Sequence, residues 1–318
     1  MPDCLEICSI FVLHVIEKGW EVEMKYSEEQ LARFSTPPSQ TERDKMDNAE
    51  KAIRNAIAAS EELKSRSIKV FAQGSYRNRV NVRAESDVDI AIVCSDTFFW
   101  QGPDGATFES LGITPATYQF ETFRKEVGDA LIDHFGADAV TPGDKAFDVH
   151  ANTYRVEADV APFFDHRRYN KNGTVFHGVE MRSRTGQQRI INWPDQHYEN
   201  GVAKNGRTGR SYKGCVRILK SVKNAMADAG IASAKAVPSF LMECLIWNVA
   251  DNVLNQNTWQ SAMRDSLAHL FNNTMTDEKC GEWGEVSELK YLFRANQPWN
   301  RSGAHKFVSD CWDFMGYE

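Results

Sequence analysis

The sequence predicts an α+β protein in which a mixed sheet packs against a mainly helical lobe. Strand-like runs dominate the first part of the chain, at Ile68–Ala72, Asp87–Val93, Phe147–His150 and Tyr154–Ala161. From about Trp193 onward, apolar residues recur at helical spacing instead. The separation of strands from helices along the chain indicates this fold class.

A long helix is expected before the sheet. Pro37-Pro38 stops the preceding segment, and Ser39 with Glu42 gives the Ser-x-x-Glu pattern of a capping box. Apolar residues then repeat at helical intervals, at Met46, Ala49, Ile53, Ala56, Ile57 and Leu63. We expect this helix to form a spine along the back of the molecule.

Further helices are expected within and after the sheet-forming part. The predicted ranges are Pro115–Phe135, Arg210–Asp228, Ser239–Leu254, Thr258–Asn272, Ser287–Arg294 and His305–Met315. We divide the chain into an N-terminal extension of uncertain status at 1–23, a core with the spine helix at 24–195, and a helical domain at 196–318.

Asp87 and Asp89 stand at the start of a strand with one residue between them. Side chains alternate along a strand, so both carboxylates point to one face and can bind a divalent cation together. Upstream, Gly74-Ser75 ends the first strand with a turn whose N–H groups and hydroxyl can face phosphate oxygens. Together the two motifs predict a metal site that handles polyphosphate, with ordinary solvated loop residues as the alternative.

A third carboxylate is expected, because two-metal phosphoryl chemistry also needs a ligand beside the attacking hydroxyl. In the run Tyr154–Ala161, Glu157 and Asp159 share the face opposite Val156, Ala158 and Val160. Asp159 lies nearest the apolar end, just before Pro162, where we expect the strand to stop. We therefore predict Asp159 as the third ligand and keep Glu157 as its competitor.

These residues resemble the bacterial cGAS/DncV-like nucleotidyltransferases of the polymerase-β-like superfamily, most closely the clade E synthases. The resemblance extends from Met24 to the C-terminus. Its motifs are Gln73–Asn78, Asn81-Val82-Arg83, Ser86–Ile90, Ala158–Pro162, Trp193-Pro194, Gln196–Tyr198, Tyr212-Lys213, Val216–Lys220, Pro238–Leu245 and Cys311–Tyr317.

The resemblance implies a polymerase-β-like fold and an enzyme that joins two nucleoside triphosphates into a cyclic dinucleotide and releases pyrophosphate. The product would signal phage infection to a downstream effector. By the same resemblance, Gln73, Gly74 and Ser75 hold the donor triphosphate. Asp87, Asp89 and Asp159 bind Mg²⁺ or Mn²⁺, and Asp159 also orients the acceptor hydroxyl.

A cationic wall for the triphosphate is expected on the helix predicted at Arg210–Asp228. At about 100° per residue, Lys213, Arg217 and Lys220 fall along one stripe beside the apolar face. Lys220 matches the family's triphosphate lysine, and Ser239 matches its triphosphate-side serine. The alternatives are a solvated basic stripe and, for Ser239, a helix N-cap.

Composition narrows the class of partner. The net charge of −7 argues against an enzyme that grips long nucleic acid, which would need a strong basic face. Arg182, Arg184 and Arg189 are the one loop cluster that could oppose this, although a solvated loop is the favoured interpretation. Seven scattered cysteines indicate neither a disulfide framework nor a zinc site. We expect a cytoplasmic protein, without a membrane segment, that acts as a monomer.

The resemblance also implies that side chains just after the third aspartate help to choose the acceptor base, where some relatives use an asparagine for uracil. There Pro162-Phe163-Phe164 carries no amide that could pair with uracil, which favours purines. ATP and GTP are therefore the expected substrates, with UTP as an alternative. Candidates to stack on a base are Tyr76, Tyr154, Tyr169 and Phe240, although core packing is the more frequent role of an aromatic residue.

Three functional classes remain open at this stage. The first is the cyclic dinucleotide synthase. The second is a related transferase that modifies a tRNA, a protein or an antibiotic. The third is a non-catalytic nucleotide-binding protein, which the intact set of Asp87, Asp89 and Asp159 beside Gly74-Ser75 disfavours.

Overall fold

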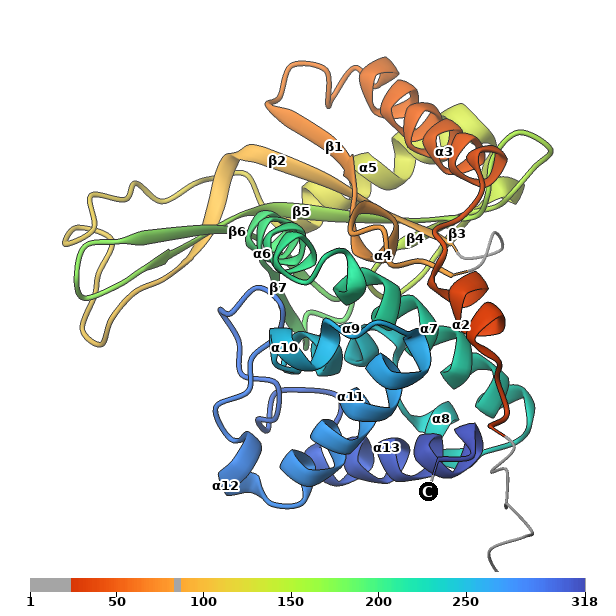
Figure 1. The fold of residues 1–318 in the computed structure, drawn as a ribbon. Coiled ribbons are helices and arrows are strands. Elements are labelled where there is room, and N and C mark those ends of the chain that lie inside the picture. The colour runs from red at the N-terminus through yellow and green to blue at the C-terminus, as the bar shows by residue number, and fades with distance from the viewer. Residues whose placement is uncertain (1–23, 83–86, 318) are drawn as a thin grey trace, which may run out of the picture.

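The computed structural model describes residues 24–82 and 87–317. The predicted extension at 1–23 lies outside these residues, as do Arg83 and Ser86 of the predicted motifs. The described residues form a seven-stranded mixed sheet with α3 and α5 on one side and a helical lobe on the other (Figure 1). The predicted α+β class and the mixed sheet are confirmed.

The strands, in chain order, are β1 (Ile68–Ala72), β2 (Val88–Gln101), β3 (Val140–Pro142), β4 (Phe147–Val149), β5 (Ala158–Tyr169), β6 (Val175–Arg182) and β7 (Arg189–Asn192). The helices are α2 (Glu28–Ser35), α3 (Gln40–Ala59), α4 (Gly74–Arg77), α5 (Phe120–Phe135), the 3₁₀ turn η1 (Ala137–Ala139), α6 (Pro194–Arg207), α7 (Ser211–Asp228), α8 (Ala232–Ala236), α9 (Ser239–Trp247), α10 (Asp251–Leu254), α11 (Trp259–Thr274), α12 (Asp277–Cys280) and α13 (Arg301–Met315).

The strand order is β1-β2-β5-β4-β3, with β6 added to β5 and β7 added to β6. β2 and β5 run parallel, and the other pairs are antiparallel. Both strands are longer than predicted, and their distal halves extend with β6 as a projecting arm at the left of Figure 1. The parallel pair at the centre of the sheet positions the candidate site.

Pro162 does not end β5, contrary to the prediction. On one side Pro162 pairs with Ile92 of β2. On the other side, pairing with β4 stops at Val160 and pairing with β6 begins at Phe164. Because Pro162 faces a gap between these two partners, its missing N–H costs no ladder hydrogen bond there.

Two hydrophobic cores hold the fold together. One lies between the sheet and helices α3 and α5, with Ile53, Ile92 and Phe123 among its fully buried side chains. The other fills the helical lobe around α7 and α9, and it includes Leu31 of α2 and Val80. Leu31 and Val80, which precede the predicted boundary at 195/196, thus complete the core of the helical lobe. The boundary itself stays a prediction.

The helix predicted after the capping box forms, whereas two other predicted helices have different bounds in the structure. Ser39 and Glu42 form the predicted capping box of α3. The expected helix at Ser239–Leu254 is divided into α9 and α10, and the one expected from Pro115 begins only at Phe120.

The helix predicted at Ser287–Arg294 is wrong. A β-bridge joins Gly284 to Tyr291, and Glu288 has a left-handed backbone with φ of 58°. The N–H of Glu285 donates to the carbonyl of Lys290, so the backbone hydrogen bonds close a turn instead of a helix.

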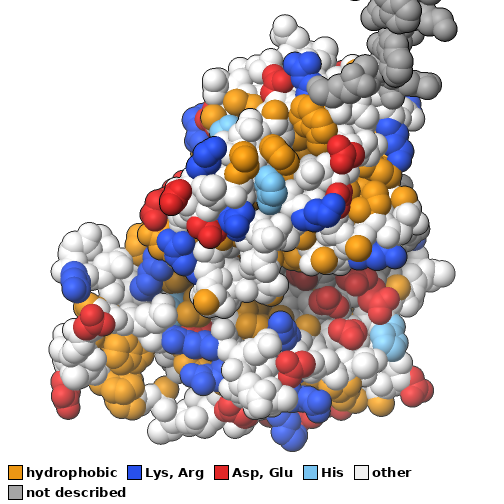
Figure 2. All heavy atoms as spheres, turned by 90° about the horizontal axis from the view of Figure 1, so that it is seen from below, with side chains coloured by type: hydrophobic (Ala, Val, Ile, Leu, Met, Phe, Trp, Pro, Cys, Tyr) orange, Lys and Arg blue, Asp and Glu red, His pale blue; other side chains and the backbone are white. Residues whose placement is uncertain are grey.

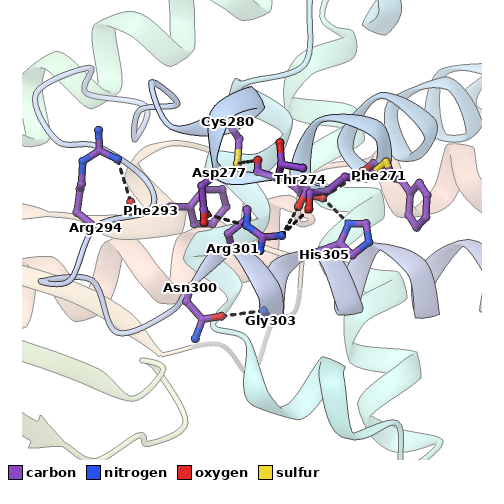
Figure 3. A network of polar contacts seen from close by, with 12 residues as sticks. Phe271, Thr274, Asp277, Cys280, Phe293, Arg294, Asn300, Arg301, Gly303 and His305 are labelled. Atoms are coloured by element: carbon purple, nitrogen blue, oxygen red, sulfur yellow. Dashed lines mark hydrogen bonds and ion pairs between the residues drawn. The ribbon is translucent and has the colours of Figure 1, made fainter.

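The corner of the lobe beyond α11 is fixed by Arg301 at the start of α13 (Figure 3). Its Nε donates to Asp277 over 2.7 Å, and one terminal nitrogen donates to the carbonyls of Thr274 and Met275. A shallow cavity of about 390 Å³ adjoins it. None of the described helices has the combination of length and apolar composition that a membrane span needs.

Candidate active site

Three neighbouring strands bring carboxylates into one row on the sheet. Asp89 on β2 opposes Asp159 on β5, and Asp159 opposes Asp148 on β4. Opposed residues on adjacent strands point to the same face, and the strands lie about 4.8 Å apart. We name Asp89, Asp159 and Asp148 the acidic row. Asp87 directly precedes β2, and Glu157 directly precedes β5.

The carboxylates of the acidic row disfavour one another's charge. Burial and the neighbouring carboxylates of Asp89, Asp87 and Asp148 raise the pKa of Asp159 to about 6. Burial and Asp87 raise the pKa of Asp89, which Lys220 partly offsets. Burial, Glu157 and Asp148 raise the pKa of Asp87. This concentration of negative charge would be relieved by a cation.

The residues fit a hard divalent cation in their chemistry. Every donor is a carboxylate oxygen, which Mg²⁺ prefers to nitrogen or sulfur. In the described ranges, 24–82 and 87–317, no three Asp, Glu, His or Cys side chains are already arranged as a closed metal-binding cluster.

The predicted glycine-serine turn lies directly against Asp89. Gly74 has φ of +59°, and a Cβ built on it would come within 2.1 Å of Asp89 Oδ2. The N–H of Gln73 donates to the Asp89 carbonyl over 2.7 Å, and the N–H of Val80 donates to the Ser75 carbonyl. Gln73, Gly74 and Ser75 thus sit beside the acidic row, and the first N–H groups of α4 have no partner within the helix.

The helical lobe supplies the positive side of the site. Lys220 on α7 is 3% exposed and Lys213 is 8% exposed. Burial lowers the pKa of both lysines, while Asp89 and Glu243 favour the charged form of Lys220. Figure 2 shows acidic side chains gathered at a hollow on one face of the molecule, with basic side chains elsewhere on that face. Both lysines are buried, so the solvated basic stripe, which was the alternative to the predicted cationic wall, is wrong.

Arg217 takes a different role from the one predicted. Its Nε donates to the carbonyl of Ser35 over 2.5 Å, and a terminal nitrogen donates to the carbonyl of Arg79 over 2.6 Å. Arg217 thereby ties α2 and the segment after the glycine-serine turn to α7. Helical periodicity correctly placed Arg217 on the same stripe as the two lysines. It could not show that the guanidinium donates its hydrogen bonds to backbone carbonyls.

Ser239 is exposed as the first residue of α9, and Pro238 occupies the N-cap position. The N-cap alternative for Ser239 is therefore wrong. Thr208, two residues before the N-cap of α7, accepts a hydrogen bond from the N–H of Tyr212. Ser239 lies one helical turn before Glu243, whose buried carboxylate contacts His197.

Asp148 is the residue of the row that sequence reasoning missed. The runs Phe147–His150 and Tyr154–Ala161 were both expected as strands, and the structure pairs them as an antiparallel hairpin, β4 with β5. The register of that hairpin, which sets Asp148 opposite Asp159, was the missing signal. The two-residue alternation of both strands puts Asp148 and Asp159 on polar faces but does not fix the register between them.

The structure removes the basis of the predicted purine preference. Pro162, Phe163 and Phe164 are all buried in the sheet. Phe164 packs against an aromatic group made of Phe99, Tyr118, Phe120 and Phe123. This segment therefore does not present its side chains to a nucleotide base.

Two of the four aromatic residues predicted to stack on a base make contacts within the protein. The Tyr76 hydroxyl donates to Asp47 of α3 over 2.5 Å, and Phe240 packs between His197 and Trp299. Tyr154 is 76% exposed, and Tyr169 ends β5.

In the predicted loop cluster, Arg189 pairs with the buried Glu180 and Arg182 lies over the Phe99 ring. The N–H of Arg184 donates to the carbonyl of Asp144. Arg189 is thus tied to the sheet instead of standing free in a solvated loop.

The chain is similar to known proteins in sequence and in fold. Residues 199–316 match the cGAS/DncV-like nucleotidyltransferase C-terminal helical domain. The chain is 39% identical over 294 residues to the cyclic dipyrimidine nucleotide synthase CdnE of Cecembia lonarensis. The alignment covers 92% of this chain and 99% of that protein.

Two solved structures are similar over nearly the whole chain. The CdnE cyclic dinucleotide synthase of Elizabethkingia meningoseptica, solved with GTP and Apcpp, has a TM-score of 0.78 and 32% identity and covers 92% of this chain and 100% of that one. The c-UMP-AMP synthase CdnE of Rhodothermus marinus, solved with Apcpp and Upnpp, has a TM-score of 0.80 and 27% identity, covering 91% and 96%. With its sheet, its helical lobe and its sequence all matching, this chain belongs to the cGAS/DncV-like nucleotidyltransferase family.

Proposed function

We propose that this protein joins two nucleoside triphosphates and closes them into a cyclic dinucleotide, with release of pyrophosphate. The observation that carries the proposal is the register of Asp89 and Asp159 beside the Gly74 turn, with Lys220 opposite. Carboxylates for a cation, a turn for phosphates and a lysine from the second lobe are the parts that phosphoryl transfer needs.

Asp87, Asp89 and Asp159 would hold Mg²⁺ or Mn²⁺, and the bound cation supplies charge stabilisation for the phosphates. Gly74 and Ser75 would orient the donor triphosphate, assisted by Gln73, which hydrogen-bonds Asp89. Lys213, Lys220 and Ser239 would bind the triphosphate from the helical lobe. Asp159 would orient the acceptor hydroxyl, and the raised pKa of its carboxyl suits it to accept a proton there.

The bases of the product stay open within this proposal. A similar relative is named a dipyrimidine synthase, and two similar structures hold GTP with Apcpp and Apcpp with Upnpp. The predicted preference for purines is therefore not supported, and uridine or cytidine triphosphate are substrates to test equally with ATP and GTP.

The test is incubation of the purified protein with labelled ribonucleoside triphosphates, singly and in all pairs, with Mg²⁺ and then phosphatase. A small phosphatase-resistant product is expected with at least one pair, and none is expected with excess chelator or from Asp87→Asn/Asp89→Asn. Label in added tRNA, protein or aminoglycoside would indicate the alternative transferase. Triphosphate binding without any product would indicate a non-catalytic protein.

The cellular part of the proposal is bacterial anti-phage signalling through an effector that binds the product. Its test is phage infection of cells that carry the natural operon with either the wild-type chain or Asp89→Asn. Protection by the wild type alone would support it, and equal protection would overturn it. We also propose that the protein acts in the cytoplasm as a monomer that needs no long nucleic acid, which light scattering and nuclease treatment of the assay check.

A further inference from the structure

The glycine-serine turn follows a strand at the open edge of the sheet. That strand, β1, is the first in the sheet order, and β2 is its only strand partner among the described residues. The backbone groups on the other side of an edge strand need partners from elsewhere in the fold. The position of the turn therefore depends on what covers this edge.

Helix α3 covers the open edge of β1 with two charged side chains. Arg54 donates to the carbonyl of Val70 over 2.6 Å, and Glu50 accepts from the N–H of Ala72 over 3.3 Å. The same Arg54 nitrogen also donates to Glu50 over 2.6 Å. The strand is thus attached to α3 up to the second residue before Gly74.

Tyr76 continues this attachment on the far side of the turn. It lies on α4, directly after Ser75, and its hydroxyl donates to Asp47 Oδ1 of α3 over 2.5 Å. Asp47 precedes Glu50 by three residues and Arg54 by seven, so the three side chains share one edge of α3. That edge therefore binds the chain both before and after the glycine-serine turn.

Both the ring and the hydroxyl of Tyr76 are engaged. The ring packs against the core between the sheet and helices α3 and α5. Burial, the hydrogen bond to Asp47 and the negative charges of Asp47 and Glu50 raise the pKa of the phenol, so the hydroxyl keeps its proton. A hydrogen bond to a carboxylate is about twice as strong as one between neutral groups. Tyr76 thus fixes the orientation of α4 against α3.

The contacts of α4 with the helical lobe come from its other end. Arg77 pairs with Asp195 of α6 over 2.7 Å, and Arg217 of α7 donates to the carbonyl of Arg79 over 2.6 Å. Figure 1 shows α4 between α3 and this lobe. If Tyr76 lost its bond to α3, these contacts would pull on α4 without a counterpart, and the turn could shift relative to the acidic row.

We propose that Tyr76 is a positioning residue that, through its hydrogen bond to Asp47, sets the glycine-serine turn against the acidic row for the donor triphosphate. The inference rests on the proposed function, since it takes this turn as the triphosphate site. It differs from the expectation that Tyr76 stacks on a base. Stacking would depend on the ring alone, whereas positioning depends on the hydroxyl and on its acceptor.

The test removes the hydroxyl and its acceptor separately, with Tyr76→Phe and Asp47→Ala. Asp47 is exposed on α3, where alanine is a favourable helix residue, so the second variant should fold. In calorimetry with Mg²⁺ we expect each variant to bind inorganic triphosphate about tenfold more weakly, because a loosened turn must be ordered on binding. The kcat/KM for product should fall by about tenfold or more. The double variant should lose no more than either single one, since both remove the same bond.

Tyr118→Phe is the matched control. Tyr118 is also partly buried against the same core, and its hydroxyl also donates to a carboxylate on a helix, Glu126 of α5. It packs on Phe164, which lies five residues beyond Asp159, roughly 16 Å along β5. This control should lower the melting temperature about as much as Tyr76→Phe and leave triphosphate affinity and product formation unchanged. An equal loss of affinity in the control would overturn the inference, because general destabilisation would then be the cause.

Hydrogen exchange reports on the turn without any reaction. The N–H of Val80 donates to the Ser75 carbonyl over 2.9 Å, so it should be protected while the turn is in place. Exchange in the peptide that spans residues 74–80 should be faster in both test variants and unchanged in the control. Unchanged exchange in the test variants would overturn the inference even if affinity fell, since a lost direct contact with the ligand would then be the cause.

The remaining outcomes separate this inference from the proposed function. Wild-type affinity and activity in Asp47→Ala, with product formed by the wild type, overturns the role of Tyr76 alone. Wild-type activity in Tyr76→Phe with loss in Tyr76→Leu would indicate stacking and also overturns it. Faster exchange and weaker triphosphate binding in both test variants, without any product from the wild type, supports the positioning role but removes the synthase proposal. Absence of triphosphate binding by the wild type overturns both.

Discussion

Asp89 and Asp159 occupy the same register on adjacent parallel strands, so that two carboxylates face each other across the centre of the sheet. Directly opposed like charges destabilise a strand pair. The fold therefore retains an unfavourable pair at the place where a cation is proposed to bind, which is typical of a site kept for function rather than stability.

Neutralising one member of this pair should stabilise the protein and inactivate it. For Asp159→Asn in metal-free buffer we expect the free energy of unfolding to rise by up to about 1 kcal/mol. Product formation should fall about a thousandfold, because loss of a metal ligand removes several kcal/mol of charge stabilisation. Urea unfolding with chelator and the labelled-nucleotide assay check the two parts. A variant that is both less stable and fully active would contradict the placement of this pair.

Gly74→Ala tests the contact between the turn and Asp89. The new Cβ would lie 2.1 Å from Asp89 Oδ2 and would also occupy a left-handed backbone at φ +59°. We expect product formation to fall by at least about tenfold, since a small displacement in such a site costs that much or more.

Gly112→Ala is the matched control for backbone strain. Its φ of +64° is similar, but nothing lies within 4 Å of its Cβ position. It should cost about 1–2 kcal/mol of stability and leave catalysis intact. Equal activity losses in the two variants would show that backbone strain, rather than collision with Asp89, is responsible.

Arg217→Lys tests whether this residue acts through the fold. A lysine keeps the charge but cannot reach the carbonyls of Ser35 and Arg79 with the same forked geometry. We expect a loss of about 1–3 kcal/mol in the free energy of unfolding, because buried carbonyls lose their donors. The KM for triphosphates should stay near the wild-type value. A raised KM with unchanged stability would return Arg217 to the triphosphate wall.

Lowering the pH should reduce the free energy of unfolding through protonation of Glu180. Burial would raise its pKa, but hydrogen bonds from His166 and Arg189 and their charges together lower the pKa below the ordinary 4.5. A carboxyl with a depressed folded pKa stabilises the fold above its unfolded pKa, and this contribution is lost as pH falls through the folded value. Between about pH 5 and pH 3 the wild type should therefore lose stability more steeply than Glu180→Gln. Parallel slopes in denaturant titrations would count against the pairing.

The sequence alone supports much of the site because its motifs are local. Gly74-Ser75, Asp87-x-Asp89 and the capping box of Ser39 depend on neighbours a few residues away. Ser39 caps α3 as expected, Gly74 turns closely against Asp89, and Asp89 lies in β2 while Asp87 directly precedes it. The position of Asp159 opposite Asp89 required only that its strand pair with the strand that carries Asp89.

What depends on long-range packing could not be predicted. Asp148 joins the row through a register, Arg217 is engaged by carbonyls from two distant segments, and Phe164 is buried by an aromatic group from other elements. The segment Ser287–Arg294 has a helical apolar pattern but is held by a β-bridge from its own Tyr291 to Gly284. In each case tertiary contacts override the local pattern.

The parallel pairing of β2 with β5 also has a consequence for biosynthesis. Strand β5 follows β2 only after helix α5, the turn η1 and the two strands β3 and β4 have been made, and parallel pairing across such a separation forms slowly. A nascent chain that has emerged only as far as β4 carries Asp87 and Asp89 but lacks their counterpart. On the proposed function, a truncated product that ends before β5 lacks Asp159 and is expected to be inactive.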